Sequence, residues 1–153
     1  MSIRALIDDV VATLGGDPSL KGMAVAYAYP PAPAVRPPVS PTLCVSLKAL
    51  ALDSGFGAGA PGRRAKVELL LELYTPAKFG AAEGVRLLPA VVQAALRLDG
   101  ATALTAGQSR CAAELDAFAL PIRLSLTAVL GEDEDLGPAF GDVEEIKVAA
   151  EGR

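Results

Sequence analysis

The chain has 153 residues, a formal net charge of −4 at pH 7 and no histidine. That length fits one domain of roughly 100–150 residues, and the lack of histidine excludes Ser-His and Cys-His catalytic pairs. Apolar residues make up 52% of the chain and aromatic residues only 5%, so small aliphatic side chains dominate. We therefore expect one folded domain that is not an enzyme and that covers part of its apolar surface with other subunits.

The first element expected is an amphipathic helix over residues 2–14. Its apolar residues recur at helical spacing and Gly15 follows as a stop signal; they are Ile3, Leu6, Ile7, Val10, Val11 and Leu14. Asp8 and Asp9 interrupt this apolar pattern, which excludes a secretory signal. No stretch approaches the roughly 20 apolar residues of a membrane-spanning helix, so we expect no membrane association.

Three strands are expected next. Residues 23–29 form a short strand, and the proline-rich residues 30–41 form a stiff extended connector, with recruitment of a peptide-binding partner as the alternative. Alternating apolar and polar residues predict a strand at 43–49, with Ala49 facing inward, and a strand at 65–74, with Tyr74 facing outward. The glycine-rich residues 53–64 between them predict a mobile hairpin loop that joins antiparallel strands.

The second half of the domain is predicted to hold one helix and two strands. Residues 81–98 have a helical apolar stripe that includes Val85 and Leu96, and Pro89 marks a kink or a helix that begins near Leu87. A weak strand is expected at 101–106, a turn at 108–116 and a long strand at 117–130. In the long strand, apolar side chains from Phe118 to Leu130 alternate with small or polar ones and form the inward face. The order α-β-β-β-α-β-β predicts an α+β fold: an antiparallel sheet of four to five strands with two helices packed on one face.

The acidic residues are concentrated at the C-terminus. Residues 132–153 hold eight acidic and two basic residues, a local charge of −6, which leaves +2 for residues 1–131. We interpret residues 1–131 as the single domain and 132–153 as an acidic extension, with a possible short strand at 144–148. A solubilising role for the extension is expected, with a docking segment as the alternative. A body near +2 has no basic stripe, so no sequence-specific binding of nucleic acid is expected.

Motifs for cofactors and metals are absent or misleading. Residues 57–62 match the GxGxxG pattern, but a strand follows them and Pro61 removes a backbone donor, so no cofactor is expected. Cys44 and Cys111 lack CxxC spacing and are expected to be buried free thiols. Two separated thiols cannot complete a zinc site, and the adjacent acids at 132–135 lack the glycine turn of a calcium loop. We therefore expect no metal.

Several segments together carry a family resemblance. They are the leading helix ending at Gly15, the Tyr-Pro segment and strand YAYPPAPAVRPP…LCVSLKAL, the strand and turn ELLLELYTPAKFGAAEG, the helix LLPAVVQAALRL, and Gly107 before ELDAFALPIRLSL. In this element order, over roughly residues 3–130, the chain resembles the tail terminator (tail completion) proteins of long-tailed phages and related tail-like particles. The proline-rich segment and the acidic extension depart from that pattern.

The resemblance implies a structural protein of the virion tail, assembled in the host cytoplasm. Such subunits form a ring, typically a hexamer, that caps the tail tube, ends its polymerisation and joins it to the head connector or neck protein. The residues we expect at the assembly contacts lie in the glycine-rich loop and on polar strand faces; they are Phe56, Arg63, Arg64, Glu68, Glu72 and Arg123. Two alternatives remain open: a neck or head-completion subunit, and a cytosolic ligand-binding α+β dimer.

Overall fold

The computed structural model describes residues 2–28, 37–52 and 62–131, with side chains described from residue 64 in the last range. Its elements are α1 (Ile3–Gly15), η1 (Pro18–Leu20), β1 (Ala24–Tyr27), β2 (Thr42–Leu52), β3 (Gly62–Pro76), η2 (Ala77–Phe79), α2 (Glu83–Leu96), β4 (Ala101–Ala106), β5 (Arg110–Ala112), η3 (Ala113–Leu115) and β6 (Ala117–Gly131). The predicted α+β class is confirmed. The expected strand at 144–148 lies outside the described residues.

The sheet has six strands in the order β1-β2-β3-β6-β4, with β5 paired to β6. All neighbours are antiparallel except β1 and β2, so the expectation of a wholly antiparallel sheet is wrong at this edge. Parallel neighbours need a connection of about a dozen residues or more, and residues 28–41 supply one between β1 and β2. The sixth strand is β5, which the sequence pattern predicted only as a turn.

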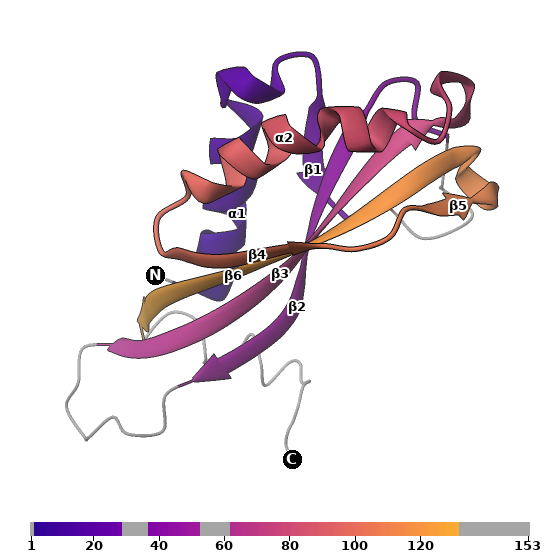
Figure 1. Cartoon of the computed structure of the whole chain (residues 1–153). Coiled ribbons are helices and arrows are strands. Elements are labelled where there is room, and N and C mark those ends of the chain that lie inside the picture. The colour runs from indigo at the N-terminus through magenta and orange to yellow at the C-terminus, as the bar shows by residue number, and fades with distance from the viewer. Residues whose placement is uncertain (1, 29–36, 53–61, 132–153) are drawn as a thin grey trace.

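Both helices pack on the same face of this sheet, as expected. The inward residues of β3 and β6, among them Leu69, Leu71, Ile122 and Leu124, are fully buried and form one core with both helices. The core residues of α1 and α2 are Leu6, Ile7, Val10, Leu14, Val91, Ala94 and Ala95. Figure 1 shows α2 lying along this helix-covered side of the sheet. The predicted inward face of the 117–130 strand is confirmed from Leu120 to Leu130, while Phe118 is half-buried.

The second helix runs through Pro89 without a break, from Glu83 to Leu96. A start near Leu87 was therefore the wrong alternative. Two residues assigned to its apolar stripe, Val85 and Leu96, are 58% and 54% exposed. The stripe that reaches the core is narrower than the apolar residues of the sequence suggested.

Strand β2 contains a bulge that the alternating pattern did not reveal. The pairing with β3 shifts between Leu47 and Ala49, so Leu50 and Leu52 face the core while Ala49 points to the other side. A one-residue insertion reverses which face each later side chain occupies. Ala49 was predicted to face inward, and this prediction is wrong.

Pro121 lies in the middle of β6, where a missing N–H would ordinarily break the ladder. Its carbonyl accepts from the Gly107 N–H at 2.8 Å, so its nitrogen also faces the side of β4 and β5. Gly107 follows β4 and β5 begins only at Arg110, so the proline occupies the gap between the two short strands. The sheet loses no ladder bond on the β3 side.

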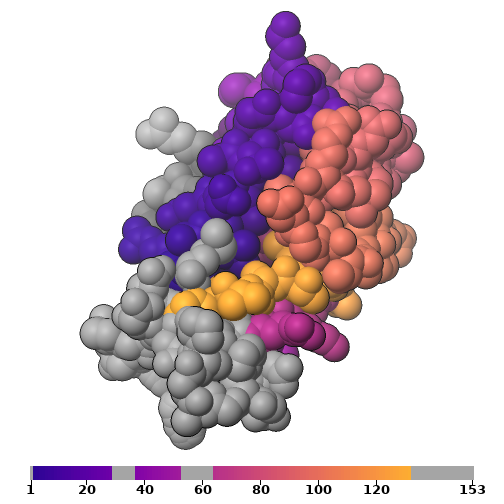
Figure 2. Space-filling view, turned by 90° about the vertical axis from the view of Figure 1, so that its left-hand side faces the viewer, coloured from indigo at the N-terminus to yellow at the C-terminus, as the bar shows by residue number. Residues whose placement is uncertain are grey.

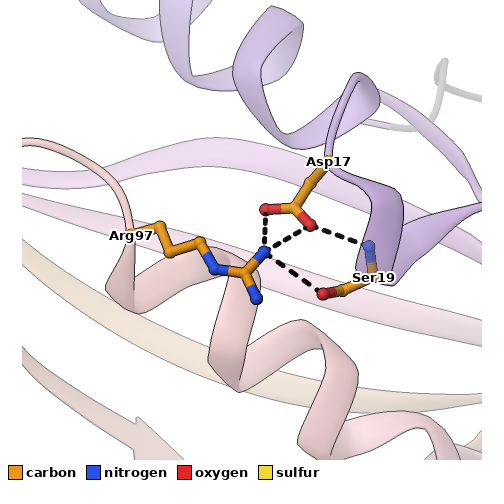
Figure 3. Close-up of polar contacts among 3 residues, drawn as sticks. All are labelled: Asp17, Ser19 and Arg97. Atoms are coloured by element: carbon orange, nitrogen blue, oxygen red, sulfur yellow. Dashed lines mark hydrogen bonds and ion pairs between the residues drawn. The ribbon is translucent and has the colours of Figure 1, made fainter.

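A cluster of three polar residues links the segment after α1 to the residue that follows α2 (Figure 3). Asp17 accepts from the Ser19 N–H at 2.8 Å, which caps η1, and from Arg97 at 2.7 and 2.8 Å. Arg97 also donates to the Ser19 hydroxyl at 3.2 Å. The Ser19 N–H and the Arg97 guanidinium together hold the pKa of Asp17 below its ordinary value. This joins the turn after α1 to the end of α2, segments that lie side by side in Figure 2.

Candidate assembly surface

The second face of the sheet carries neither α1 nor α2, and we call it the open face. It consists of alternate residues of four strands that pair in rows across the sheet. These residues are Ser46, Ala49 and Ala51 of β2, Arg64, Lys66, Glu68, Leu70 and Glu72 of β3, Pro121, Arg123, Ser125, Thr127 and Val129 of β6, and Ala103 and Thr105 of β4. Lys48, at the bulge, borders a groove on the same face. Small and polar side chains dominate it, which contrasts with the leucine-rich core face.

One end of this face is covered by β5 and η3. There a second small cluster buries Cys44, Tyr74, Ala112, Leu115, Ala117 and Ala119. Glu72 joins this end to the rest of the face, because it accepts from the Tyr74 hydroxyl at 3.1 Å and from Arg110 at 3.2 Å. These contacts hold the short strand β5 against β3 across the intervening β6.

The structure brings four of the six predicted assembly residues onto the open face. Glu68 and Arg123 form an ion pair at 3.9 Å, Glu72 pairs with Arg110, and Arg64 is exposed opposite Val129. At such exposed positions an ion pair is worth about 0–1 kcal/mol, so these pairs orient side chains more than they stabilise the fold.

The two other predicted residues are not brought to this site by the described structure. Phe56 lies outside the described residues. The backbone of Arg63 pairs with Leu130 in the β3–β6 ladder, and its side chain is not described.

Sequence reasoning missed Arg110 and Tyr74. Arg110 stands in a stretch interpreted as a turn, and three residues are too few to show strand alternation. Tyr74 was placed outward on its strand, yet it is only 6% exposed because β5 and η3 cover it. No local signal in the sequence marks that cover.

Burial, and then the neighbouring Glu72 carboxylate, raise the pKa of Tyr74 to about 12. The pKa of Tyr74 is thus higher in the folded protein than its ordinary value of 10.0, which applies to the unfolded chain. The contribution of the protonated Tyr74 to the free energy of unfolding is therefore complete below pH 10.0 and disappears as pH rises toward about 12. We expect the chain to lose stability in that window, and Tyr74→Phe to lose less over the same interval. Denaturant titrations of both proteins at successive pH values, with phenolate absorbance to follow ionisation, test this. Equal losses in both proteins would contradict it.

Strand β4 forms one edge of the sheet, and its pairing with β6 shifts register between Ala101 and Ala103, so it is regular only from Ala103 onward. Its residues Ala101–Ala106 include no charge and no proline, and most are exposed. The Gly107 N–H donates to the Pro121 carbonyl, so the backbone N–H and C=O groups of residues 103, 105 and 107 point toward β6. The N–H and C=O groups of Leu104 and Ala106 therefore point outward. Natural edge strands usually carry charges, prolines or bulges against pairing. From Ala103 to Ala106, β4 therefore presents outward backbone groups with which a further strand can pair.

Strand β1 forms the opposite edge. The Ala24 and Ala28 N–H groups donate to Pro41 and Val45 at 3.2 and 3.1 Å, so the backbone groups of Val25 and Tyr27 point outward. A groove beside this edge, about 560 Å³ in volume, is lined by Ile3, Arg4, Ile7, Asp8, Tyr27 and Leu47. Tyr27 is 60% exposed within it, so apolar surface accompanies the open edge.

Within the described residues, no three acidic or cysteine side chains are arranged to hold a metal ion. Cys44 is buried as expected, whereas Cys111 is exposed, which corrects the prediction for the second thiol. Among the described helices, none is both long and apolar enough to cross a membrane.

No family model matches the chain, and no curated protein matches its sequence. Solved structures with a similar backbone include a chain of the structure titled "Virion of native gene transfer agent (GTA) particle". The two chains are 18% identical with a TM-score of 0.45, over 84% of this chain and 95% of the other. A likeness of this size does not establish a function for this protein.

Proposed function

We propose that this protein is a tail terminator of a phage or phage-like particle. Copies of the chain form a ring, of six by the resemblance, that caps the tail tube, stops its growth and meets the connector or neck. The element order and the turns that resemble tail terminators support the family. A virion is also the setting of the chain with the similar backbone, at a similarity too low to support the assignment by itself.

The observation that carries self-association is the pair of open edges. Strand direction alternates from β2 through β3 and β6 to β4, and β1 runs with β2, so β1 and β4 point in opposite directions. When copies stand side by side in one orientation, β4 of one copy therefore meets β1 of the next as an antiparallel neighbour. Such a head-to-tail contact leaves an open edge at each end, and a rotation that closes it gives a ring.

The strength of this contact explains why assembly would need a template. Two outward residues on each strand exchange at most four backbone hydrogen bonds. At about 1 kcal/mol net each they contribute about 4 kcal/mol. Association costs at least about 4 kcal/mol, so an isolated pair gains almost nothing from the edges alone. The apolar groove at Tyr27 and the tube end supply the remainder, and free subunits stay mostly apart until they meet a tube.

A backbone substitution on each edge tests the proposal. Ala106→Pro removes an outward N–H from β4, and Val25→Pro removes an outward N–H from β1. Ala106→Val keeps the N–H of residue 106 and serves as the matched control. We expect both proline variants to fold, to form no rings on tubes of the particle's tail-tube protein, and to leave those tubes uncapped and longer in electron micrographs. The valine variant should cap tubes as the unchanged chain does.

Mixing the two proline variants separates a ring from a dimer. In a head-to-tail contact, the intact β1 of one variant pairs with the intact β4 of the other, so the mixture yields pairs and no rings. In a two-fold dimer through β4 alone, Val25→Pro assembles normally. Chemical cross-linking of the mixture and of each variant alone, in the presence of tubes, distinguishes the two patterns. Normal capping by both proline variants would overturn the edge contact, and a strict dimer would favour the cytosolic alternative.

A neck or head-completion subunit is the second candidate from the same particle. It uses the same edges but binds the head side, so it would leave tube length unchanged in the assay above.

A further inference from the structure

Basic residues gather on the open face. Among described side chains it carries Lys48, Arg64, Lys66, Arg110 and Arg123 against Glu68 and Glu72, a net charge of 5 − 2 = +3. All other described side chains carry five basic and seven acidic residues, a net charge of −2. The overall acidity of the chain therefore conceals a cationic sheet face opposite the helices.

Three of these cations have no acidic partner within the described parts of the chain. Glu68 and Glu72 pair with Arg123 and Arg110, at 3.9 and 3.2 Å. Lys48, Arg64 and Lys66 are exposed, and no described carboxylate lies within ion-pair distance of them. The surplus positive charge is thus at the bulge of β2 and along the first half of β3.

A shallow groove crosses this cationic region. It has a volume of about 560 Å³, and its lining includes Ala49, Ala51, Ala103 and Thr127 together with one basic and one acidic residue, Lys66 and Glu68. The alanine side chains leave room for the backbone of an extended segment to approach the sheet. The groove gives space to an extended peptide, and the surplus cations of the open face, rather than the groove lining itself, favour an acidic one.

The acidic extension starts at this end of the face. β6 ends at Gly131, which pairs with Gly62, two residues before Arg64. Residues 132–153 follow, with eight acidic and two basic side chains. At about 3.3 Å per extended residue, 22 residues reach about 70 Å, more than the roughly 50 Å of the 15-residue β3. A tethered segment of this length is present at an effective concentration near the millimolar range, so weak ion pairs suffice.

We propose that residues 132–153 dock in cis on the open face of their own subunit, with their carboxylates on Lys48, Arg64 and Lys66. The extension then neutralises the surplus positive charge of the open face and keeps other anionic surfaces away from it. This inference goes beyond the proposed function and holds for a single subunit, whether or not rings form.

Paramagnetic relaxation in the full chain tests the docking. A nitroxide is attached at Ala139→Cys in a Cys111→Ser background, since Cys111 is the exposed thiol and Cys44 is buried. We expect loss of amide signals for Lys66, Ala49 and Thr127 on the open face, and retained signals over α1. Raising NaCl to about 1 M, where the Debye length is about 3 Å, should restore the lost signals.

Two controls decide what occupies the face. Arg64→Glu with Lys66→Glu should restore the signals, while the same charge change at Arg4 and Lys21, which are exposed residues of α1 and of the end of η1, should not. Mixing isotope-labelled chains that carry no nitroxide with unlabelled chains that carry it should give no broadening. Broadening in that mixture would mean that a second copy's extension binds, and broadening over α1 or nowhere in the full chain would overturn the proposal outright.

Discussion

Leu124→Asp is expected to leave the chain unable to fold. Leu124 is 0% exposed, and it lies between Leu69 of β3 and Leu104 of β4 in the sheet. Placing a carboxylate there without a partner costs several kcal/mol, whereas the whole stability of a domain is about 5–15 kcal/mol. The variant should be insoluble or lack a cooperative unfolding transition when followed by circular dichroism.

Thr127→Asp is the matched control for this substitution. Thr127 stands on the same strand but on the open face, where it is exposed, so the same carboxylate remains in water and beside Lys66. That variant should fold and melt cooperatively. A soluble Leu124→Asp with a native-like transition would mean that β6 is shifted by one residue, since such a slip moves every side chain to the opposite face.

The long strands were the part of the fold that could be predicted best. β3 and β6 alternate apolar and polar side chains over most of their 15 residues each, so both their existence and their inward faces follow from the side-chain period. The same alternation placed Glu68 and Glu72 on the polar face of one strand and Arg123 on the polar face of another, and the pairing of β3 with β6 brings these two faces together.

The sheet edges could not be predicted from local pattern. The four residues of β1 are compatible with either direction, and the choice depends on where the connector at residues 28–41 carries the chain. β5 has only three residues and owes its pairing to Glu72 and Tyr74, which are far away in the sequence. Contacts of this kind depend on the assembled sheet, so the charge partner of Glu72 was missed.

The sequence of β2 contains a signal for its bulge, a change of parity among its apolar residues. Leu43, Val45 and Leu47 keep one parity, whereas Leu50 and Leu52 keep the other. A change of parity inside one apolar strand indicates an inserted residue, because both sets must reach the same core. In residues 42–52 the parity changes between Leu47 and Leu50, so the inserted residue is Lys48 or Ala49.

Gly100→Ala is expected to be the most damaging exchange of a glycine for alanine in the described chain. Gly100 joins α2 to β4 at a φ of +81°, and a Cβ there would lie 2.2 Å from the Thr127 carbonyl oxygen. Its own carbonyl accepts from the Thr127 N–H at 2.9 Å, so the two backbones touch. The left-handed conformation costs alanine about 1–2 kcal/mol, and losing the strand-joining hydrogen bond adds about 1 kcal/mol. A loss of at least about 2–3 kcal/mol follows.

Gly22→Ala separates the two causes. Gly22 has a similar φ of +87°, but a Cβ there meets nothing within 4 Å. Its loss in denaturant titrations therefore measures the cost of the positive φ alone, and the excess loss in Gly100→Ala measures the contact with Thr127. Equal losses at the two sites would mean that β4 does not approach β6 as closely as described. Because β4 is the edge proposed to pair with β1 of the next subunit, a large excess at Gly100 would also predict weaker capping of tail tubes by this variant.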